Sequence, residues 1–413
     1  MGPYLDLLRR EKDFRRAYLA QLIALGGDWF AIIPLLVLLP QLTGTGIWGA
    51  LVLAADTLAF ALVGPYAGTV IDRLDRRKVI VSSNIVAGCA ALLLVLVRSE
   101  ATAWIALVAI GIVAGAKAFA QPAGAAAVPN LVDPADLSTA TVLSGASWGI
   151  MLAVGAALGG LMSATLGYTF CFLLDAVLLL SAAALTASTT RSFSDPQAPP
   201  RGRRPVREDL GEAFGYARRD RRVLALITCK SGPAFGNGAL SLFPLYGAAA
   251  FSLGPLGIGL MYSARGVGAL AGPLLLRRRA TEPARLYGVL GASMAVFGLG
   301  YLALGLTSWF WLVLVLLAVA HAGGGANWIL STYGLQSVVP DSLRGRVFSV
   351  DYTLATLIIA GSQVVFGLLS DVVPARDLLS ASGGIVLLYA CCWWLVTRRL
   401  GTPAPPLVTA EES

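Results

Sequence analysis

A small set of ionisable side chains lies inside long apolar stretches of this sequence, where a charge is costly. An ionisable group within a membrane-spanning segment costs about 2.5–3.5 kcal/mol on insertion scales, so it needs a partner, a cavity or a function. A carboxyl and an amine in such a place can exchange protons as their solvation changes, or they can form a static ion pair. The candidates for this chemistry are Asp28, Lys117, Lys230, Arg265 and His321.

Asp28 is the first candidate for a proton carrier. It follows Gly26 and Gly27, where backbone packing is loose and water can enter. Lys117 lies at a similar depth in a later apolar stretch and would change how tightly the carboxyl holds its proton. The alternative is a static Asp28–Lys117 ion pair that holds two segments together.

The other candidates have more than one reading. His321 is either a proton relay or a buried histidine held by a hydrogen bond. Arg265 either reaches a central cavity or lies in a contact between the two halves, and Trp29 either faces that cavity or packs. Further acids are Asp56, Asp175 (expected to be structural, near the outer rim) and Asp351 (expected one turn into its segment).

The composition explains why these charges are few. Of 413 residues, 57% are hydrophobic and 13% are charged, and the mean hydropathy is +0.74. A soluble domain carries about 25% charged residues, so a soluble enzyme, a disordered chain and a nucleic-acid binder are excluded despite the net charge of +8. The five cysteines have no metal-ligand spacing and there is one histidine, so we expect no metal, no cofactor and no enzyme activity.

Twelve apolar segments are long enough to cross a bilayer as helices. Two long apolar runs are divided at Gly254-Pro255 and at Thr307-Ser308-Trp309. The expected spans are residues 17–39, 48–71, 79–97, 104–127, 138–162, 168–187, 223–248, 256–276, 286–306, 310–334, 347–370 and 379–397.

The basic residues predict the orientation of these spans. With this division, 26 of the 31 Lys and Arg residues fall on one side of the membrane, which places both termini in the cytoplasm. A polar segment, 188–222, separates two six-span halves, 1–187 and 223–413. Its second part, Val206–Arg222, is either an amphipathic surface helix or a solvated loop. The expected fold is an all-α membrane protein with twelve spans in two bundles.

Two loop motifs give a family resemblance. The stretch Gly68-Thr-Val-Ile-Asp72-Arg73-Leu-Asp75-Arg76-Arg77 resembles the loop 2–3 signature of the major facilitator superfamily, with Asp75 in place of the usual second glycine. The stretch from Val339 to Val347, Val-Pro-Asp-Ser-Leu-Arg-Gly-Arg-Val, resembles its drug:proton antiporter branch, which contains macrolide-efflux proteins and the enterobactin exporter. The resemblance covers the whole chain.

The resemblance implies a role for each motif. Asp72 would face the start of span 11 and, with nearby arginines, would hold the halves together at the cytoplasmic side; the alternative is that these charges only enforce topology. The residues carried over to this gate are Gly68, Asp72, Arg73, Arg76, Arg77, Asp341, Arg344, Gly345 and Arg346. Span 5 has alanine where the antiporter signature carries proline, but its glycines still allow close helix packing: Gly149, Gly155, Gly159 and Gly160.

The function expected from these observations is proton-coupled export of a hydrophobic or amphipathic small molecule, such as a drug, a macrolide-like metabolite or a siderophore. Spans 1, 4, 7 and 10 would line the central cavity of the resembling fold. The rivals are a lipid or lysolipid translocator of the same fold and a non-transporting receptor or assembly factor. Arginine outnumbers lysine 27 to 4, which suggests a GC-rich bacterium and its inner membrane. We expect a monomer in the lipid bilayer whose partners are the substrate and protons.

Overall fold

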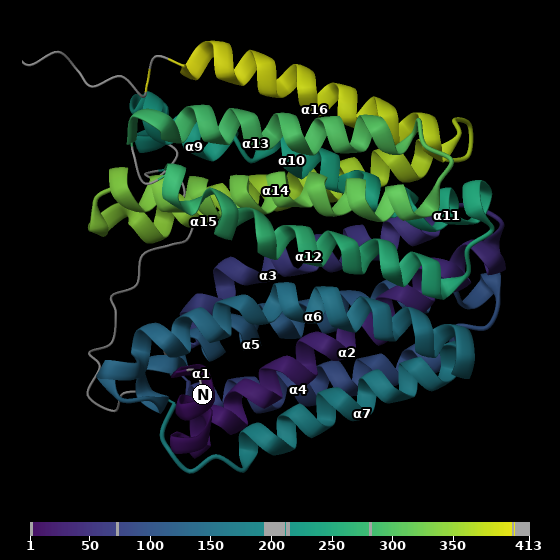
Figure 1. The fold of residues 1–413 in the computed structure, drawn as a ribbon. Helices are drawn as coiled ribbons and strands as arrows, with labels where there is room; N and C mark the ends of the chain where they lie inside the picture. Colours follow the sequence, from purple (N-terminus) through teal and green to yellow (C-terminus); the bar gives the residue numbers. More distant parts are fainter. Residues whose placement is uncertain are drawn as a thin grey trace, which may run out of the picture.

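The computed structural model describes residues 3–71, 74–193, 211, 215–280, 283–398 and 400, and within these residues the regular structure is entirely helical. Two groups of long helices lie side by side, one from each half of the chain (Figure 1). The all-α membrane fold predicted from the sequence is confirmed.

The first half begins with a short helix, α1 (Pro3–Arg10), that packs on the end of the bundle. Six long helices follow: α2 (Lys12–Thr43), α3 (Ile47–Ile71), α4 (Arg76–Leu93), α5 (Trp104–Leu131), α6 (Leu137–Leu166) and α7 (Tyr168–Ala187). Short 3-10 turns extend or link them: η1 (Leu94–Leu96), η2 (Glu100–Thr102) and η3 (Pro134–Asp136).

The second half starts with a segment of short helices and continues with five long ones. The short pieces are α9 (Arg221–Thr228), α10 (Ser231–Asn237), η4 (Gly238–Leu242) and α11 (Phe243–Phe251). The long helices are α12 (Pro255–Ala280), α13 (Pro283–Leu304), α14 (Phe310–Val338), α15 (Asp341–Leu369) and α16 (Ala375–Thr397). The turns expected at Gly254-Pro255 and at residues 307–309 therefore fall where helices end and begin.

Ten helices in the described part of the chain are long and apolar enough to cross a membrane by length and composition. The two expected spans outside this group are the seventh, which is broken into α9–α11, and the eighth, α12, whose glycines and Arg265 lower its hydropathy. Several helices extend past the predicted spans, because a helix can continue beyond the bilayer with polar residues. Thus α15 begins at Asp341 rather than at residue 347, which places Asp351 ten residues into the helix instead of one turn.

Proline and glycine account for the interrupted seventh span. Pro233 and Pro244 lack the backbone N–H that would bond to Cys229 and Leu240, and their rings crowd those carbonyls. The chain breaks near both carbonyls, between α9 and α10 and within η4. Side chains satisfy backbone groups there, since Tyr262 Oη donates to the Leu240 carbonyl oxygen at 3.0 Å.

The two halves meet along two helix pairs, α6 with α12 and α3 with α15. Glycine allows the closest approach: a Cβ on Gly160 of α6 would lie 2.6 Å from the Pro255 carbonyl oxygen and 3.0 Å from the Gly259 Cα. The largest buried apolar cluster also joins the halves, with Leu36 and Leu152 packed in the same core as Phe243. The halves are thus held together by close backbone packing as well as by apolar burial.

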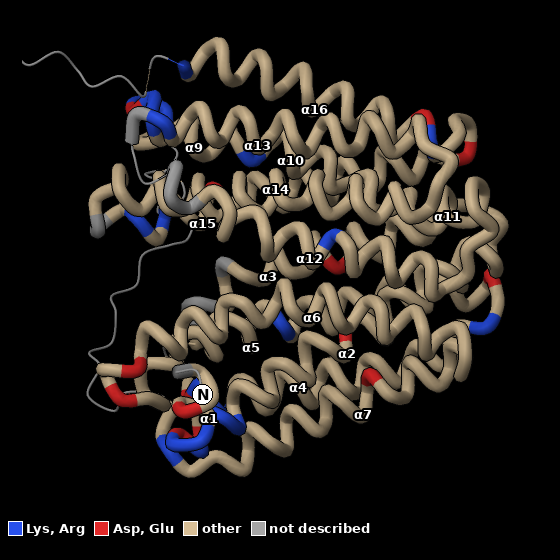
Figure 2. Tube along the Cα trace, in the orientation of Figure 1, with Lys and Arg blue, Asp and Glu red and all other residues tan. Residues whose placement is uncertain are grey.

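Charged residues gather at one end of the molecule, where α2 begins (Figure 2). We call the end that carries Arg9, Arg76 and Arg191 the basic end, and the other the opposite end. Contacts between the halves are found near the middle of the helices and at the opposite end. Near the middle of the helices, the Phe60 and Tyr352 rings lie 6.0 Å apart, and at the opposite end the Gly46 backbone N–H donates to Asp371 Oδ1 at 3.2 Å.

Polar contacts fix the chain after α7 against the start of the first half. Asp13 accepts hydrogen bonds from Thr190 Oγ1 (2.7 Å) and from the Arg191 backbone N–H (2.9 Å). The Arg191 guanidinium also lies 2.9 Å from Glu11 Oε2. These contacts place Phe193, which is fully buried, beneath the basic end of the first bundle.

Candidate functional site

An ion pair joins the middle of α2 to the middle of α5. Asp28 and Lys117 are in direct contact, and only 14% and 12% of their side chains are exposed. Asp28 lies about halfway along α2, which continues through Gly26 and Gly27 without a break. A Cβ on Gly26 would already be 3.3 Å from Met151 Sδ, so the missing side chain lets α6 approach. The structure therefore brings Asp28 and Lys117 together. The sequence left two alternatives for them, a proton carrier with a neighbouring lysine or a static ion pair.

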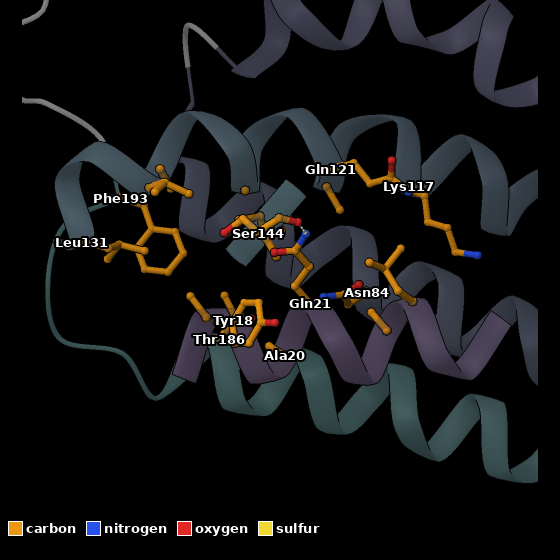
Figure 3. Close-up of a pocket in the computed structure, with 18 of the residues that line it drawn as sticks. Tyr18, Ala20, Gln21, Asn84, Lys117, Gln121, Leu131, Ser144, Thr186 and Phe193 are labelled. Atoms are coloured by element: carbon orange, nitrogen blue, oxygen red, sulfur yellow. Dashed lines mark hydrogen bonds between the residues drawn. The ribbon is translucent and has the colours of Figure 1, made fainter. Parts of the chain in front are cut away.

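The ion pair borders a cavity of about 80 Å³ inside the first half. Figure 3 shows the cavity with Lys117 toward one end and Leu131 and Phe193 toward the other. Its walls come from α2, α4, α5, α6 and α7, together with Phe193. The cavity therefore leads from the basic end to the charged pair in the middle of the bundle.

The cavity lining combines apolar surface with uncharged polar groups. Phe14, Tyr18 and Leu25 contribute apolar atoms, while amide and hydroxyl groups are interspersed among them. The polar lining residues without charge are Gln21, Asn84, Gln121, Ser144 and Thr186. The amide of Gln21 donates to the Ser144 carbonyl oxygen at 3.4 Å and so links α2 to α6 (Figure 3). Such a lining suits an amphipathic molecule.

Two further acids lie near the ion pair. Asp56 of α3 interacts electrostatically with both Asp28 and Lys117. Asp175 of α7 is fully buried, and neither carboxylate oxygen has a hydrogen-bond partner. Its Oδ1 would lie 2.8 Å from a Cβ on Gly27, so it packs against the residue that precedes Asp28. Asp175 therefore lies in the core of the bundle, beside the candidate site, rather than at its rim.

A second buried ion pair, which the sequence did not predict, lies in the second half. Lys230 stands in the break between α9 and α10 and contacts Asp351 of α15, with 2% and 4% of the side chains exposed. The ammonium also lies 3.1 Å from Thr332 Oγ1 and 5.1 Å from the centroid of the Trp328 ring. The interrupted span is thus attached to both α14 and α15. The signal in the sequence was a single lysine, Lys230, in one apolar segment and a single aspartate, Asp351, in another.

His321 lies in the core of the second half. Its Nε2 is hydrogen-bonded to Tyr301 Oη at 3.0 Å, and the Phe297 ring packs edge-on at 5.3 Å. Only 4% of His321 is exposed, and it is absent from the lining of the cavity described above. This is the arrangement of the buried, hydrogen-bonded histidine that the sequence left open.

Arg265 and Trp29 lie where the halves meet. The Arg265 guanidinium of α12 lies 5.6 Å from the centroid of the Trp148 ring of α6. Trp29 of α2 packs against Tyr262 of α12 with ring centroids 5.8 Å apart. Both residues are therefore in contacts between the halves; such a contact was one alternative for Arg265, and packing was one for Trp29.

The first loop motif is described in part. Asp72 and Arg73 lie outside the described residues, and Gly68 belongs to α3. Arg76 donates to the Ala126 carbonyl oxygen at 2.8 Å, and Arg77 donates to the Ala187 carbonyl oxygen, so both tie α4 to neighbouring segments. Asp75 replaces the glycine of the family pattern and caps α4, since its Oδ1 accepts from the Arg77 backbone N–H at 2.8 Å.

The second loop motif forms the start of α15. Asp341 is its first residue, and Arg344 donates to the Val339 carbonyl oxygen at 3.5 Å. A Cβ on Gly345 would meet nothing within 4 Å, and Arg346 lies on the same helical turn. The motif therefore lies at the basic end of the second half, as the start of α4 does in the first.

The four glycines singled out in span 5 all lie at close approaches. A Cβ on Gly155 would be 2.7 Å from the Trp29 ring, and one on Gly159 would collide with the Trp29 carbonyl oxygen. Gly149 faces the Leu270 side chain and Gly160 faces the start of α12. One face of α6 therefore contacts α2, and the other contacts the second half.

No group of three or more His, Cys, Asp or Glu side chains is arranged to hold a metal ion in the described part of the chain. Four of the buried ionisable groups instead form two pairs, Asp28–Lys117 in the first half and Lys230–Asp351 in the second. Two six-helix halves with charged groups near the middle of the bundle are the architecture of a secondary transporter.

Comparison with known proteins identifies the family. The family model of the Major Facilitator Superfamily matches residues 18–360. The chain belongs to the Major Facilitator Superfamily, a family of transporters rather than enzymes, and it is a multi-pass membrane protein. The resemblance seen in the loop motifs is therefore confirmed at the level of the superfamily.

Individual relatives are distant. The chain is 23% identical over 365 residues to macrolide efflux protein A of Streptococcus pyogenes, covering 85% of this chain and 88% of that one. Among solved structures it is similar to a bacterial homologue of the human lysosomal transporter Spinster, in an inward-facing and unoccupied conformation (TM-score 0.74, 16% identity, 98% and 100% of the two chains). It is also similar to the human organic anion transporter MFSD10 (TM-score 0.68, 17% identity, 95% and 100%). At these identities the structures show the fold alone.

Proposed function

We propose that this transporter exports a hydrophobic or amphipathic small molecule in exchange for protons. The observation that carries the proposal is the Asp28–Lys117 pair in the middle of the first bundle. An amphipathic cavity leads to this pair from the basic end. A carboxylate in that position can accept a proton only by weakening its attraction to the ammonium. Protonation, occupancy of the cavity and the distance between α2 and α5 are then linked.

The exchange follows from competition for one carboxyl group. With Asp28 ionised, the pair with Lys117 holds α2 and α5 together. A proton on Asp28 removes that attraction, frees the Lys117 ammonium and changes the shape and charge of the cavity. A substrate that prefers one of these states shifts the equilibrium only as far as its affinities for the two states differ. Protons and substrate therefore move in opposite directions when each favours a different state.

The orientation in the membrane, together with the positions of the cavity and of the contacts between the halves, supports an inward-facing state. Basic residues concentrate on the cytoplasmic side of membrane proteins, so we place the basic end and both termini in the cytoplasm of a bacterial inner membrane. Contacts between the halves then close the outer side, while the cavity leads inward. In the outward-facing state, the gate would be formed by the two loop motifs: Gly68, Asp72, Arg73, Arg76, Arg77, Asp341, Arg344, Gly345 and Arg346.

Two observations favour the direction of transport and the substrate class that we propose. The cavity lining is largely apolar with interspersed amides and hydroxyls, which suits amphipathic molecules. The distant relatives are named for macrolide efflux, which favours export of a drug or a macrolide-like metabolite, with a siderophore as a further candidate. The bilayer supplies the environment, and we propose that a monomer is the functional unit.

Purified protein in proteoliposomes tests the proposal. An imposed pH gradient should drive accumulation of a member of a panel of amphipathic compounds by the wild type, and Asp28→Asn should lose it. Asn cannot take up and release the proton, although it has nearly the same size as Asp. Asp133→Asn is the matched control, because that carboxyl is 64% exposed at the basic end and should leave transport unchanged.

The same assay separates the rival function. Gradient-driven transport by Asp28→Asn at the wild-type rate would remove Asp28 from the coupling. Transport of single-chain lipids that is indifferent to the pH gradient in the wild type would instead favour a lipid translocator.

A further inference from the structure

We propose that Arg265 and Trp148 form a binding site for an anionic group, and therefore that the transported molecule is an amphipathic anion. This inference deepens the proposed function. The claim that the bound anion is also transported rests on that function. The site lies between the two halves, with Arg265 on α12 and Trp148 on α6. The ligand class is a planar or chain-like apolar body that carries a carboxylate, sulfonate or phosphate.

Arg265 differs from the other two cations in the middle of the bundles. Lys117 contacts Asp28 and Lys230 contacts Asp351. Among the residues that the structure describes, no acid pairs with Arg265, and its Nε is buried without a hydrogen-bond partner. One of these three cations therefore lacks a counter-charge from the described part of the chain.

This unpaired charge cannot disappear by losing its proton. A lysine, a histidine or a carboxyl without a partner can become neutral, whereas the guanidinium stays charged in proteins. Burying a charge without a partner is strongly unfavourable, so a persistent buried cation implies a counter-ion, water or a ligand. The Trp148 ring offsets part of this cost through a cation–π contact at 5.6 Å.

The neighbours of Arg265 do not supply the missing anion. Its electrostatic neighbours are Tyr262, Tyr301 and His321. The Tyr262 hydroxyl already donates to the Leu240 carbonyl oxygen, and Tyr301 is bonded to His321. None of these groups carries a negative charge when it makes those hydrogen bonds. The guanidinium thus retains donors for an external acceptor.

The Trp148 residue is accessible, and one of its neighbours along α6 lines the cavity of the first half. Trp148 is 48% exposed, although Leu152, one turn further on, is fully buried. Ser144, one turn earlier, lines the cavity, and residues four apart share one face of a helix. An apolar body can therefore pack on the ring while its anionic group meets the Arg265 guanidinium, which binds carboxylates and phosphates through paired hydrogen bonds.

Binding to purified protein in detergent tests this site without any transport measurement. Equilibrium dialysis compares three probes that share one ring system: naphthoate, naphthyl methanol and naphthylmethylammonium. Decyl phosphate and decyl glucoside form a second, lipid-like pair. We expect the wild type to bind naphthoate about tenfold or more tighter than naphthyl methanol, the effect of a charge-assisted hydrogen bond. A preference for decyl phosphate alone would identify the anion as a lipid headgroup.

Two variants and one control decide the outcome. Arg265→Gln should abolish the preference for the anion and leave the affinity for naphthyl methanol unchanged, whereas Arg98→Gln, in an exposed loop, should change neither. If Arg265→Gln does not fold, Arg265→Lys should still weaken anion binding, because the planar fork is lost. Equal affinities for the anionic and neutral probes in the wild type, or an unchanged preference in both Arg265 variants, would overturn the proposal.

The failure of this site can be distinguished from failure of proton coupling. Asp28→Asn should keep the wild-type preference for naphthoate in the dialysis assay, even though it loses transport driven by the pH gradient. If Asp28→Asn retained that transport, the coupling assignment would fall while the anion site stood on its own measurement.

Discussion

At the scale of single residues, depth along a span can be read from the sequence where the ends of the span are predicted correctly, but the direction in which a side chain points cannot. Asp28 and Lys117 could be matched because both stand near the middle of their helices, and a pair between them was one of two alternatives. Lys230 and Asp351 were not matched. The predicted start of span 11 placed Asp351 too near the surface, and no pattern in a uniformly apolar helix shows which neighbour a side chain faces.

The buried Lys230–Asp351 pair should be important for stability. Removing one partner leaves the other charge buried and unpaired, so Lys230→Met or Asp351→Asn should each lower the free energy of unfolding by about 3–5 kcal/mol. The double variant Lys230→Met/Asp351→Asn should lose less than the sum of the single changes. Unfolding in mixed micelles with increasing denaturing detergent measures these differences.

A surface pair provides the comparison for this cycle. Arg10 and Asp136 lie 2.9 Å apart with 60% and 19% of their side chains exposed, so Arg10→Met or Asp136→Asn should cost no more than about 1 kcal/mol. Equal losses from the surface pair and the buried pair would show that Lys230–Asp351 does not hold the broken span in place.

At the scale of helices, the number and order of spans followed from hydropathy, but the shape of the seventh did not. Pro233 and Pro244 were visible signals of a break, yet the surrounding residues are apolar enough to read as one continuous span. Glycine positions were more informative. Their spacing in α6 indicated close packing, although which helix would approach each glycine depends on the three-dimensional arrangement.

A larger side chain at Gly160 should impair the contact between α6 and α12. A Cβ there would lie 2.6 Å from the Pro255 carbonyl oxygen, so Gly160→Val should cost about 1–3 kcal/mol of packing energy in the state described here and slow transport. Gly111→Val is the matched change, since a Cβ at Gly111 on α5 would meet nothing within 4 Å. The thermal midpoint in detergent and the transport rate are the measurements. Equal behaviour of both variants would argue against a close contact at Gly160.

At the scale of the whole molecule, the two-bundle architecture could be predicted and the conformational state could not. The alternation of basic loops, the central polar segment and the loop motifs all describe the chain's topology, which is the same in every state of a transport cycle. The contacts that define the state, such as Gly46 with Asp371, join residues far apart in the sequence. They depend on how the two halves are rotated relative to each other, and this rotation leaves no pattern in the sequence.

A cross-link at the opposite end should stop the cycle. The site of a Cβ on Gly46 lies 2.6 Å from Ser370 Oγ, so Gly46→Cys/Ser370→Cys, in a background lacking the native cysteines, is placed to form a disulfide. Oxidation should abolish transport and reduction should restore it, because the outer side could no longer open. Mass spectrometry confirms the bond. Full transport by the oxidised, cross-linked protein would exclude opening at this position.

The central claim is that Asp28 couples proton movement to the change of state, and one measurement tests it most directly. Once a substrate is identified, proteoliposomes containing wild type or Asp28→Asn should be assayed for gradient-driven accumulation and for exchange of labelled for unlabelled substrate without a gradient. Exchange needs alternating access but no net proton movement. The account predicts that Asp28→Asn keeps exchange and loses accumulation. Accumulation by Asp28→Asn to the wild-type level, driven by the same pH gradient, would contradict it.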